Sequence, residues 1–309
     1  MQMVAFLFPG QGSQFPGMGK ELYDNFAVAR EVFEEANDAL GFDLAAMCFN
    51  GPEEDLKLTT NTQPAILTTS IAAQRVLQQE TDLKPGYVAG HSLGEYSALV
   101  CAEGLAFADA VRTVRKRGAF MQEAVPVGDG AMAAVIGLDQ DDLEVVCKEA
   151  AQGEVVSPAN FNSPGQVVIA GNVAAVNRAI ELAKERGAKR ALPLPVSAPF
   201  HCSLMDPAGK RLAEVLETVS VASLQFPVVT NVEASPNQEA GRIKELLVAQ
   251  VSAPVRWEES VRAMLGLGVE RFVEIGPGRV LAGLIKRIAK GTAVQNLQDV
   301  KDLNALQGA

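Results

Sequence analysis

A serine in a tight, glycine-flanked turn is the first residue of this chain that could carry chemistry. Residues 90–94 read GHSLG, which fits the pattern GxSxG with Ser92 at its centre. The short apolar run at 87–89 predicts a strand, and residues 95–102 predict a helix. A strand, a sharp turn and a helix in this order are typical of a nucleophile elbow, which exposes the serine hydroxyl beside free helix N–H groups. This context favours the elbow over a plain turn rich in small residues.

A serine nucleophile needs a base, which is most often histidine. The chain has two histidines, His91 and His201. His91 directly precedes Ser92 in the turn, where adjacent side chains diverge, so His201, on a proline-containing loop much later in the chain, is the better candidate. The alternative for His201 is a structural loop histidine that hydrogen-bonds a nearby carbonyl. No spacing selects an Asp or Glu as a third member, and a backbone carbonyl could orient the ring equally well.

A basic cluster follows on a helix predicted near residues 107–123, and it consists of Arg112, Arg115, Lys116 and Arg117. For most of these residues a solvated helix face is the better interpretation. An arginine turned toward the elbow would instead bind a substrate carboxylate with its two-pronged guanidinium. The spacing alone does not say which residue that would be.

A glycine-rich segment, GQGSQ at residues 10–14, follows a strand predicted at 4–8. It lacks both the lysine of a phosphate-binding loop and the GxGxxG spacing, which argues against nucleotide binding. A flexible turn is the simplest interpretation. A loop of this kind at the end of a strand could also supply an oxyanion N–H.

The elements around these residues predict an α/β protein with an inserted unit. Strands alternate with helices before and after the middle of the chain, which indicates a mostly parallel sheet. Residues 126–196 instead show the order β-α-β-β-α-β of a ferredoxin-like unit. We therefore expect a large domain formed by residues 1–125 and 197–309, and a small domain formed by residues 126–196.

Composition excludes several classes of protein. The chain has 309 residues, 48% hydrophobic and 21% charged, as in ordinary globular proteins. Its 27 basic and 37 acidic residues give a net charge of −10, which argues against nucleic acid as a partner. Four dispersed cysteines and two histidines form no pattern for a metal site. We find no secretory signal and no membrane span, and expect a cytoplasmic protein and a monomer.

Several segments together resemble one enzyme family. The chain is similar to bacterial malonyl-CoA:acyl-carrier-protein transacylases and to the acyltransferase domains of fatty-acid and polyketide synthases. The segments that carry the resemblance run in family order: FPGQGSQ at 8–14, GHSLGEY at 90–96, Arg117 with Met121 and Gln122, NFNSPGQ at 160–166, PFH at 199–201 and EIGPG at 274–278.

The resemblance implies a fold and an activity. The fold would combine an α/β-hydrolase-like large domain having a parallel sheet with an inserted ferredoxin-like small domain. The activity would be transfer of a malonyl group from malonyl-CoA to the phosphopantetheine thiol of acyl carrier protein, through a malonyl-serine intermediate, for fatty-acid or polyketide synthesis. No cofactor would be bound permanently, since the carrier protein brings the phosphopantetheine.

The resemblance also implies roles for individual residues. Ser92 would be the nucleophile and His201 its base, while Arg117 would bind the malonyl carboxylate. The other roles it implies are backbone N–H donors of an oxyanion hole at Gln11 and Leu93, a main-chain carbonyl at Gln250 that orients His201, and pocket-lining side chains at Asn160 and Phe200. In synthase relatives, Phe before the histidine and Leu after the serine accompany malonyl rather than methylmalonyl.

Two other functions remain as alternatives. A serine esterase would hydrolyse thioesters without transfer, but this chain lacks an HGGG-type oxyanion loop and an evident acid. A non-catalytic docking subunit would bind carrier protein without acylation. Acyl carrier proteins are strongly acidic, so docking needs a local basic surface. The candidates for that surface, which could also be scattered solvated charges, are Lys189, Arg190, Lys286, Arg287 and Lys290.

Overall fold

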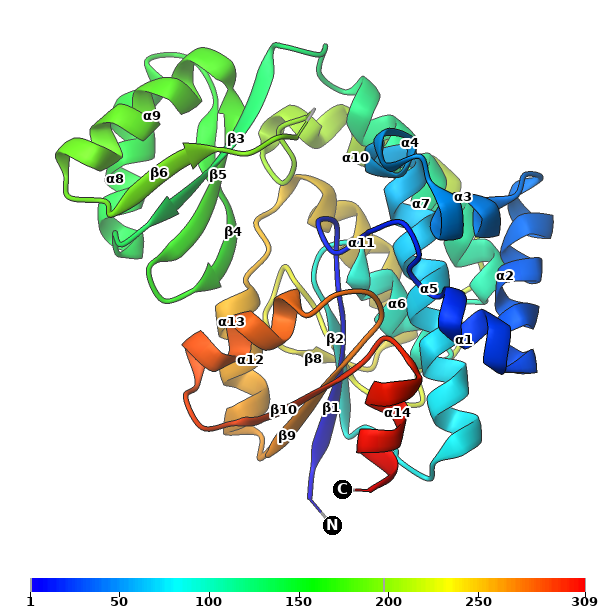
Figure 1. The fold of residues 1–309 in the computed structure, drawn as a ribbon. Coiled ribbons are helices and arrows are strands. Elements are labelled where there is room, and N and C mark those ends of the chain that lie inside the picture. Colours follow the sequence, from blue (N-terminus) through cyan, green and yellow to red (C-terminus); the bar gives the residue numbers. More distant parts are fainter. Residues whose placement is uncertain (1, 197, 309) are drawn as a thin grey trace.

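The computed structural model describes residues 2–196 and 198–308, and these form two sheets with separate helical layers (Figure 1). The larger sheet has the strand order β10-β9-β1-β2-β7-β8. Adjacent strands of this sheet run parallel, except that β7 and β8 pair antiparallel. Its strands are β1 (Val4–Phe8), β2 (Tyr87–Gly90), β7 (Val228–Val229), β8 (Pro236–Asn237), β9 (Arg271–Ile275) and β10 (Ala293–Leu297).

Helices cover both faces of this sheet. Strand β1 is buried along its whole length, and its side chains alternate between two hydrophobic clusters. Phe6 and Phe8 pack with α2, α5, α6 and α7, whereas Ala5 and Leu7 pack with α12 and α13. The helices of this part are α1 (Lys20–Asn25), α2 (Ala27–Leu40), α3 (Leu44–Asn50), α4 (Glu53–Lys57), α5 (Thr59–Glu80), α6 (Gly94–Cys101), α7 (Phe107–Glu123), α10 (Asp206–Glu217), α11 (Ile243–Ser252), α12 (Trp257–Gly266), α13 (Val280–Ile288) and α14 (Val300–Gln307).

The smaller sheet is antiparallel, with the order β4-β5-β3-β6. It encloses a core of its own with helices α8 and α9. Its elements are β3 (Gly130–Ile136), α8 (Gln140–Ala151), β4 (Val156–Ser163), β5 (Gln166–Asn172), α9 (Val173–Glu185) and β6 (Arg190–Pro193). This order and connectivity are those of the predicted ferredoxin-like unit, which lies beside the larger sheet in Figure 1.

Backbone hydrogen bonds join the two parts at one edge of β4. The N–H of Phe161 donates to the carbonyl of Val255 at 2.9 Å, and the N–H of Val255 donates to the carbonyl of Ala159 at 2.9 Å. The NFNSPGQ segment is thereby held against the chain between α11 and α12. We retain 126–196 as the proposed extent of the small domain. Ser197, at the proposed boundary, lies outside the described residues, as do Met1 and Ala309.

Neither a membrane-crossing helix nor a metal cluster is found in the described part of the chain. No helix there is long and apolar enough to cross a bilayer. Likewise, no group of three or more His, Cys, Asp or Glu side chains within residues 2–196 and 198–308 is placed to hold a metal ion.

Candidate active site

Ser92 lies in the sharp turn between β2 and α6, and its backbone has φ 50°. This left-handed conformation is uncommon for a residue with a side chain and is strained. Gly94 is required by crowding, because a Cβ there would lie 2.0 Å from the carbonyl oxygen of Phe8. Gly90 is equally crowded, since its Cβ would lie 1.9 Å from the backbone of Gly94. The geometry is therefore that of a nucleophile elbow.

His201 contacts the serine hydroxyl directly. The distance between its Nε2 and Ser92 Oγ is 2.7 Å. Its Nδ1 faces two backbone carbonyls, those of Gln250 at 2.9 Å and Ala253 at 3.2 Å. Carbonyls only accept hydrogen bonds, so Nδ1 carries the proton and Nε2 is free to accept the proton of Ser92.

The protonation state of His201 follows from its surroundings. Burial, and next the charge of Arg117, lower its pKa to about 3 against the raising effect of the Gln250 carbonyl. The ring is therefore neutral at physiological pH and can accept a proton.

His91 points elsewhere. Its Nε2 lies 2.8 Å from the side-chain oxygen of Asn162, on strand β4, and its ring packs against Trp257. The expectation that the side chains of His91 and Ser92 diverge holds. His91 thus links the elbow to the small domain.

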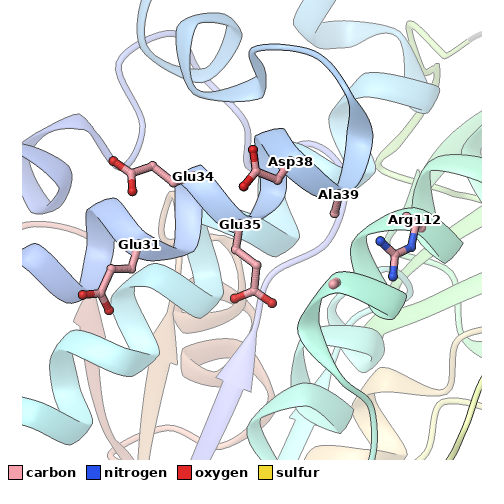
Figure 2. A pocket seen from close by; sticks show the side chains of 7 residues that line it. Glu31, Glu34, Glu35, Asp38, Ala39 and Arg112 are labelled. Carbon is pink, nitrogen blue, oxygen red and sulfur yellow. The ribbon is translucent and has the colours of Figure 1, made fainter.

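The basic cluster separates into four different environments. Arg112 lies at a separate pocket beside α2, and Arg115 donates to Asn61 at 2.9 Å. Lys116 is exposed, whereas Arg117 is buried, with only 2% of its surface exposed. Figure 2 shows the acidic side chains that line the pocket of Arg112, which are Glu31, Glu34, Glu35 and Asp38.

Arg117 is the member of the cluster that reaches the elbow. Its Nη2 donates to Ser92 Oγ at 3.2 Å and to the side-chain oxygen of Gln250 at 2.9 Å. Its Nη1 donates to the side-chain oxygen of Gln63 at 2.7 Å. The remaining donor, Nε, has no hydrogen-bond partner among the described residues. A buried guanidinium held by two neutral amides is a fixed positive charge beside the serine.

A pocket of ≈ 310 Å³ opens above these groups, between the two sheets. It brings together the residues expected to form the site except Gln250, whose contacts lie just beneath it. Both Gln11 and Leu93 line it, and the loop of Gln11 packs tightly on the elbow, since a Cβ on Gly10 would lie 2.4 Å from the carbonyl oxygen of His91. The lining residues of the expected site are Gln11, Ser92, Leu93, Arg117, Asn160, Phe200 and His201.

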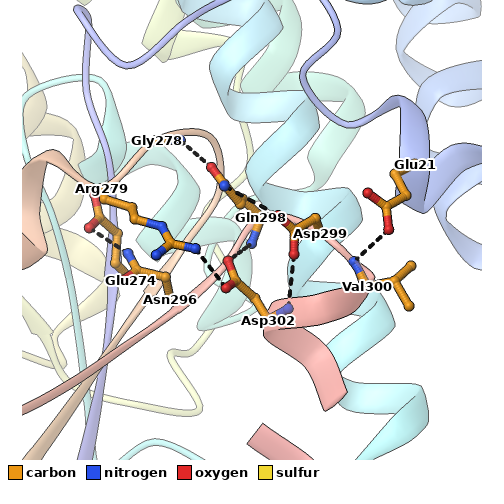
Figure 3. A network of polar contacts seen from close by, with 9 residues as sticks. All are labelled: Glu21, Glu274, Gly278, Arg279, Asn296, Gln298, Asp299, Val300 and Asp302. Carbon is orange, nitrogen blue, oxygen red and sulfur yellow. Dashed lines mark hydrogen bonds and ion pairs between the residues drawn. The ribbon is translucent and has the colours of Figure 1, made fainter. Parts of the chain in front are cut away.

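The far wall of the pocket is formed by α13. Leu281 and Leu284 of this helix line the pocket. Buried Glu274, at the end of β9, accepts hydrogen bonds from the N–H groups of Leu281 at 3.0 Å and Ala282 at 2.8 Å. Figure 3 shows Glu274 within a larger polar network that includes Asn296. The EIGPG segment thus anchors a wall of the site.

Three further polar residues support the site without having been expected from the sequence. Gln63 holds Arg117, and Asn231 accepts the N–H of Ser92 at 2.7 Å. Glu95 accepts from both Asn231 and Gln250. No pattern marks Gln63 or Asn231 in the sequence. Glu95 had one signal, its place directly after the GHSLG turn.

The profile of the acyl transferase domain family matches residues 5–305. The chain belongs to the acyl transferase domain family. This acyltransferase is 52% identical to a malonyl CoA-acyl carrier protein transacylase of Salmonella typhimurium over 305 residues, which is 99% of each chain. It is 54% identical to a protein of the same name from Escherichia coli over 288 residues, or 93% of each chain.

Solved structures agree with this assignment. An acyl carrier protein S-malonyltransferase from Vibrio cholerae superimposes with a TM-score of 0.96 at 51% identity, covering 98% of this acyltransferase and 99% of that chain. A malonyl-transacylase solved in complex with a type II PKS acyl-carrier protein gives a TM-score of 0.97 at 52% identity, covering 99% and 100%. The resemblance and the predicted fold class are both confirmed.

Proposed function

We propose that this acyltransferase moves the malonyl group of malonyl-CoA to the phosphopantetheine thiol of acyl carrier protein, through a malonyl ester on Ser92. One observation carries this assignment to the site: a serine in contact with a neutral histidine shares its pocket with a buried arginine. The serine and histidine suit acyl transfer, and the arginine suits an acyl group that ends in a carboxylate.

The first half-reaction loads the serine. His201 Nε2 takes the proton of Ser92 Oγ as the oxygen attacks the thioester carbonyl. The resulting oxyanion lies between the backbone N–H groups of Gln11 and Leu93, each of which is worth ~10²-fold or more in rate by analogy with other such donors. When the C–S bond breaks, the leaving CoA sulfur takes the proton from His201.

The second half-reaction reverses these steps with a new thiol. The phosphopantetheine thiol gives its proton to His201 and attacks the ester carbonyl. The C–O bond then breaks, and Ser92 Oγ recovers the proton. The carbonyl of Gln250 holds the Nδ1 proton throughout, so His201 exchanges protons only through Nε2.

Arg117 would hold the malonyl carboxylate during both steps. Its guanidinium is fixed by Gln63 and Gln250, so little freedom is lost when a carboxylate binds. Phe200 and Leu93 would set the size of the acyl group, with malonyl preferred to methylmalonyl. Asn160 would line the pocket from the small domain.

The carrier protein would dock on a basic surface around the pocket mouth. Arg287, on α13, hydrogen-bonds Gln166, which itself lines the pocket. Lys286 and Arg287 are exposed and belong to the helix whose other face forms the pocket wall. In the described part of the chain, none of the five candidate residues forms an ion pair, so their charges are available. These five are Lys189, Arg190, Lys286, Arg287 and Lys290, which lies just past the end of α13.

A cytoplasmic location, a monomeric state and the absence of a permanently bound cofactor complete the proposal. The four cysteines are buried free thiols, as expected in a reducing compartment. Light scattering coupled to size-exclusion chromatography measures the oligomeric state, and a mass twice that of the chain would contradict the monomer.

The decisive experiment separates acyl transfer from the two alternatives. The protein is incubated with malonyl-, acetyl- and methylmalonyl-CoA, and the acylated residue is found by mass spectrometry. The acylated protein is then divided between two reactions, one with acyl carrier protein and one with water alone. We expect a malonyl adduct on Ser92 that is discharged by the carrier. Steady hydrolysis without thiol transfer would indicate an esterase, and carrier binding without an adduct would indicate a docking subunit.

A further inference from the structure

A buried polar assembly lies directly beneath the elbow. It consists of Glu95 on α6, Asn231 in the turn after β7 and Gln250 on α11, and each exposes 1% of its surface or less. One carboxyl oxygen of Glu95 accepts the backbone N–H of Asn231 at 2.8 Å and the side-chain amide of Gln250 at 2.9 Å. Polar groups this deeply buried are costly unless their hydrogen bonds are made, so the assembly has a specific arrangement.

Two members of the assembly hold the backbone of Ser92 from opposite sides. The side-chain oxygen of Asn231 accepts the N–H of Ser92 at 2.7 Å, and its amide donates to the carbonyl of Gly90 at 2.7 Å. The amide of Gln250 donates to the carbonyl of Ser92 at 3.1 Å. The N–H and the carbonyl of the strained serine are thus each held by a side chain of the assembly, and Glu95 binds both residues that provide those side chains.

We propose that Glu95 is a positioning residue for acyl transfer, which acts on Ser92 through Asn231 and Gln250. The proposal rests on the assignment of Ser92 as the nucleophile. Glu95 binds Asn231, which holds the N–H of Ser92, and it binds Gln250, whose carbonyl orients His201. A single carboxyl group therefore supports the nucleophile and the segment that orients its base.

Strain makes this support necessary. Positive φ at a residue such as Ser92 is strained and persists only where the surroundings enforce it. Without the contacts of Asn231, the turn can relax, and both Ser92 Oγ and the N–H of Leu93 move together. A displacement of ~1 Å at a reacting group costs ~10²-fold in rate.

Hydrogen-bond acceptance, rather than charge, is the property of Glu95 on which this role depends. Burial raises the pKa of Glu95 to about 7, and the contacts with Asn231 and Gln250 oppose that rise. Either protonation state keeps an oxygen that can accept from both partners. Glutamine at this position retains such an oxygen, whereas methionine has similar length and retains none.

The test compares Glu95→Gln, Glu95→Met and Asn231→Ala with a matched control, Ser97→Ala. Ser97 lies on the same helix and is buried, and its hydroxyl has no hydrogen-bond partner among the described residues. The rate of Ser92 sulfonylation by phenylmethylsulfonyl fluoride is measured by mass spectrometry. This probe carries no malonyl group or thioester, so it reports on the elbow whether or not the chain transfers malonyl. Malonyl transfer gives kcat and KM in parallel, and thermal denaturation verifies folding.

We expect Glu95→Met and Asn231→Ala to slow sulfonylation and to lower kcat about 100-fold. Glu95→Gln should stay within about 3-fold of the wild type, and Ser97→Ala should match it. For Asn231→Ala, KM for malonyl-CoA should be little changed, because the contacts of Arg117 remain. The double variant Glu95→Met/Asn231→Ala should be no slower than the slower single variant, since both changes release the same turn.

Sulfonylation of folded Asn231→Ala at the wild-type rate would overturn the proposal, because Asn231 is the link to the N–H of Ser92. Equal losses in Glu95→Gln and Glu95→Met would also overturn it, since the charge would then be the important property. If Glu95→Met does not fold, sulfonylation of Asn231→Ala at the wild-type rate or a loss of rate in Glu95→Gln would overturn the proposal. Normal sulfonylation in the wild type without malonyl transfer would refute the proposed function alone.

Discussion

Replacing Arg117 with alanine should change which acyl group the enzyme prefers, rather than simply slowing it. Arg117 is buried, and its guanidinium is already oriented by Gln63 at 2.7 Å and Gln250 at 2.9 Å. Removing one partner of a buried charged pair costs about 2–5 kcal/mol, which corresponds to about 30- to 5,000-fold in kcat/KM for malonyl-CoA. The acetyl group of acetyl-CoA has no carboxylate that could pair with Arg117, so kcat/KM for acetyl-CoA should fall far less.

The assay offers both donors in competition and measures malonyl- and acetyl-pantetheine by mass spectrometry. Arg115→Ala is the matched control, because Arg115 lies on the same helix but contacts Asn61 instead of the elbow. It should leave the ratio of malonyl to acetyl product unchanged. Arg117→Lys should recover only part of the selectivity, since it keeps the charge and loses the two-pronged geometry. If Arg117→Ala lowered both donors by the same factor, Arg117 would be structural, and its assignment as carboxylate receptor would be refuted.

Four other predictions test the remaining parts of the site. Ser92→Ala should abolish the acyl-enzyme seen by mass spectrometry, and malonyl labelling of another residue would contradict the nucleophile assignment. Charge reversal at Lys286 and Arg287 should raise KM for acyl carrier protein and weaken the salt dependence of that KM, while KM for free pantetheine should barely change. An equal loss of activity with both acceptors would exclude docking at these residues. Because burial lowers the pKa of His201 to about 3, the rate of Ser92 acylation by acetyl-CoA should stay level as the pH falls through 6.5, and an inflection of that rate near 6.5 would contradict this. The folding stability that His201 contributes above pH 6.5 should be lost as the pH falls toward 3. Phe200→Ser should raise methylmalonyl relative to malonyl transfer by enlarging the pocket, and an unchanged ratio in the competition assay would remove Phe200 from the specificity determinants.

Much of the architecture could be predicted from local patterns. The apolar run of β1 and the GHSLG turn are recognisable because apolar runs and glycine spacing are local features of the chain. The β-α-β-β-α-β order of residues 126–196 likewise predicted the antiparallel sheet that the structure contains. Scarcity added one long-range inference, since with two histidines only His201 could face Ser92.

The tertiary structure decided what the spacing left open. Four basic side chains share one helix, and only packing turns Arg117 inward to meet Gln63, 54 residues away, and Gln250, 133 residues away. Glu95 lies beside the elbow in the sequence, yet its partners Asn231 and Gln250 lie on segments more than a hundred residues later. Periodicity indicates which face of a helix or strand is buried, but it does not indicate which distant side chains that face contacts. Those contacts depend on how β2, α7 and α11 converge at one end of the sheet, and only the folded chain determines that arrangement.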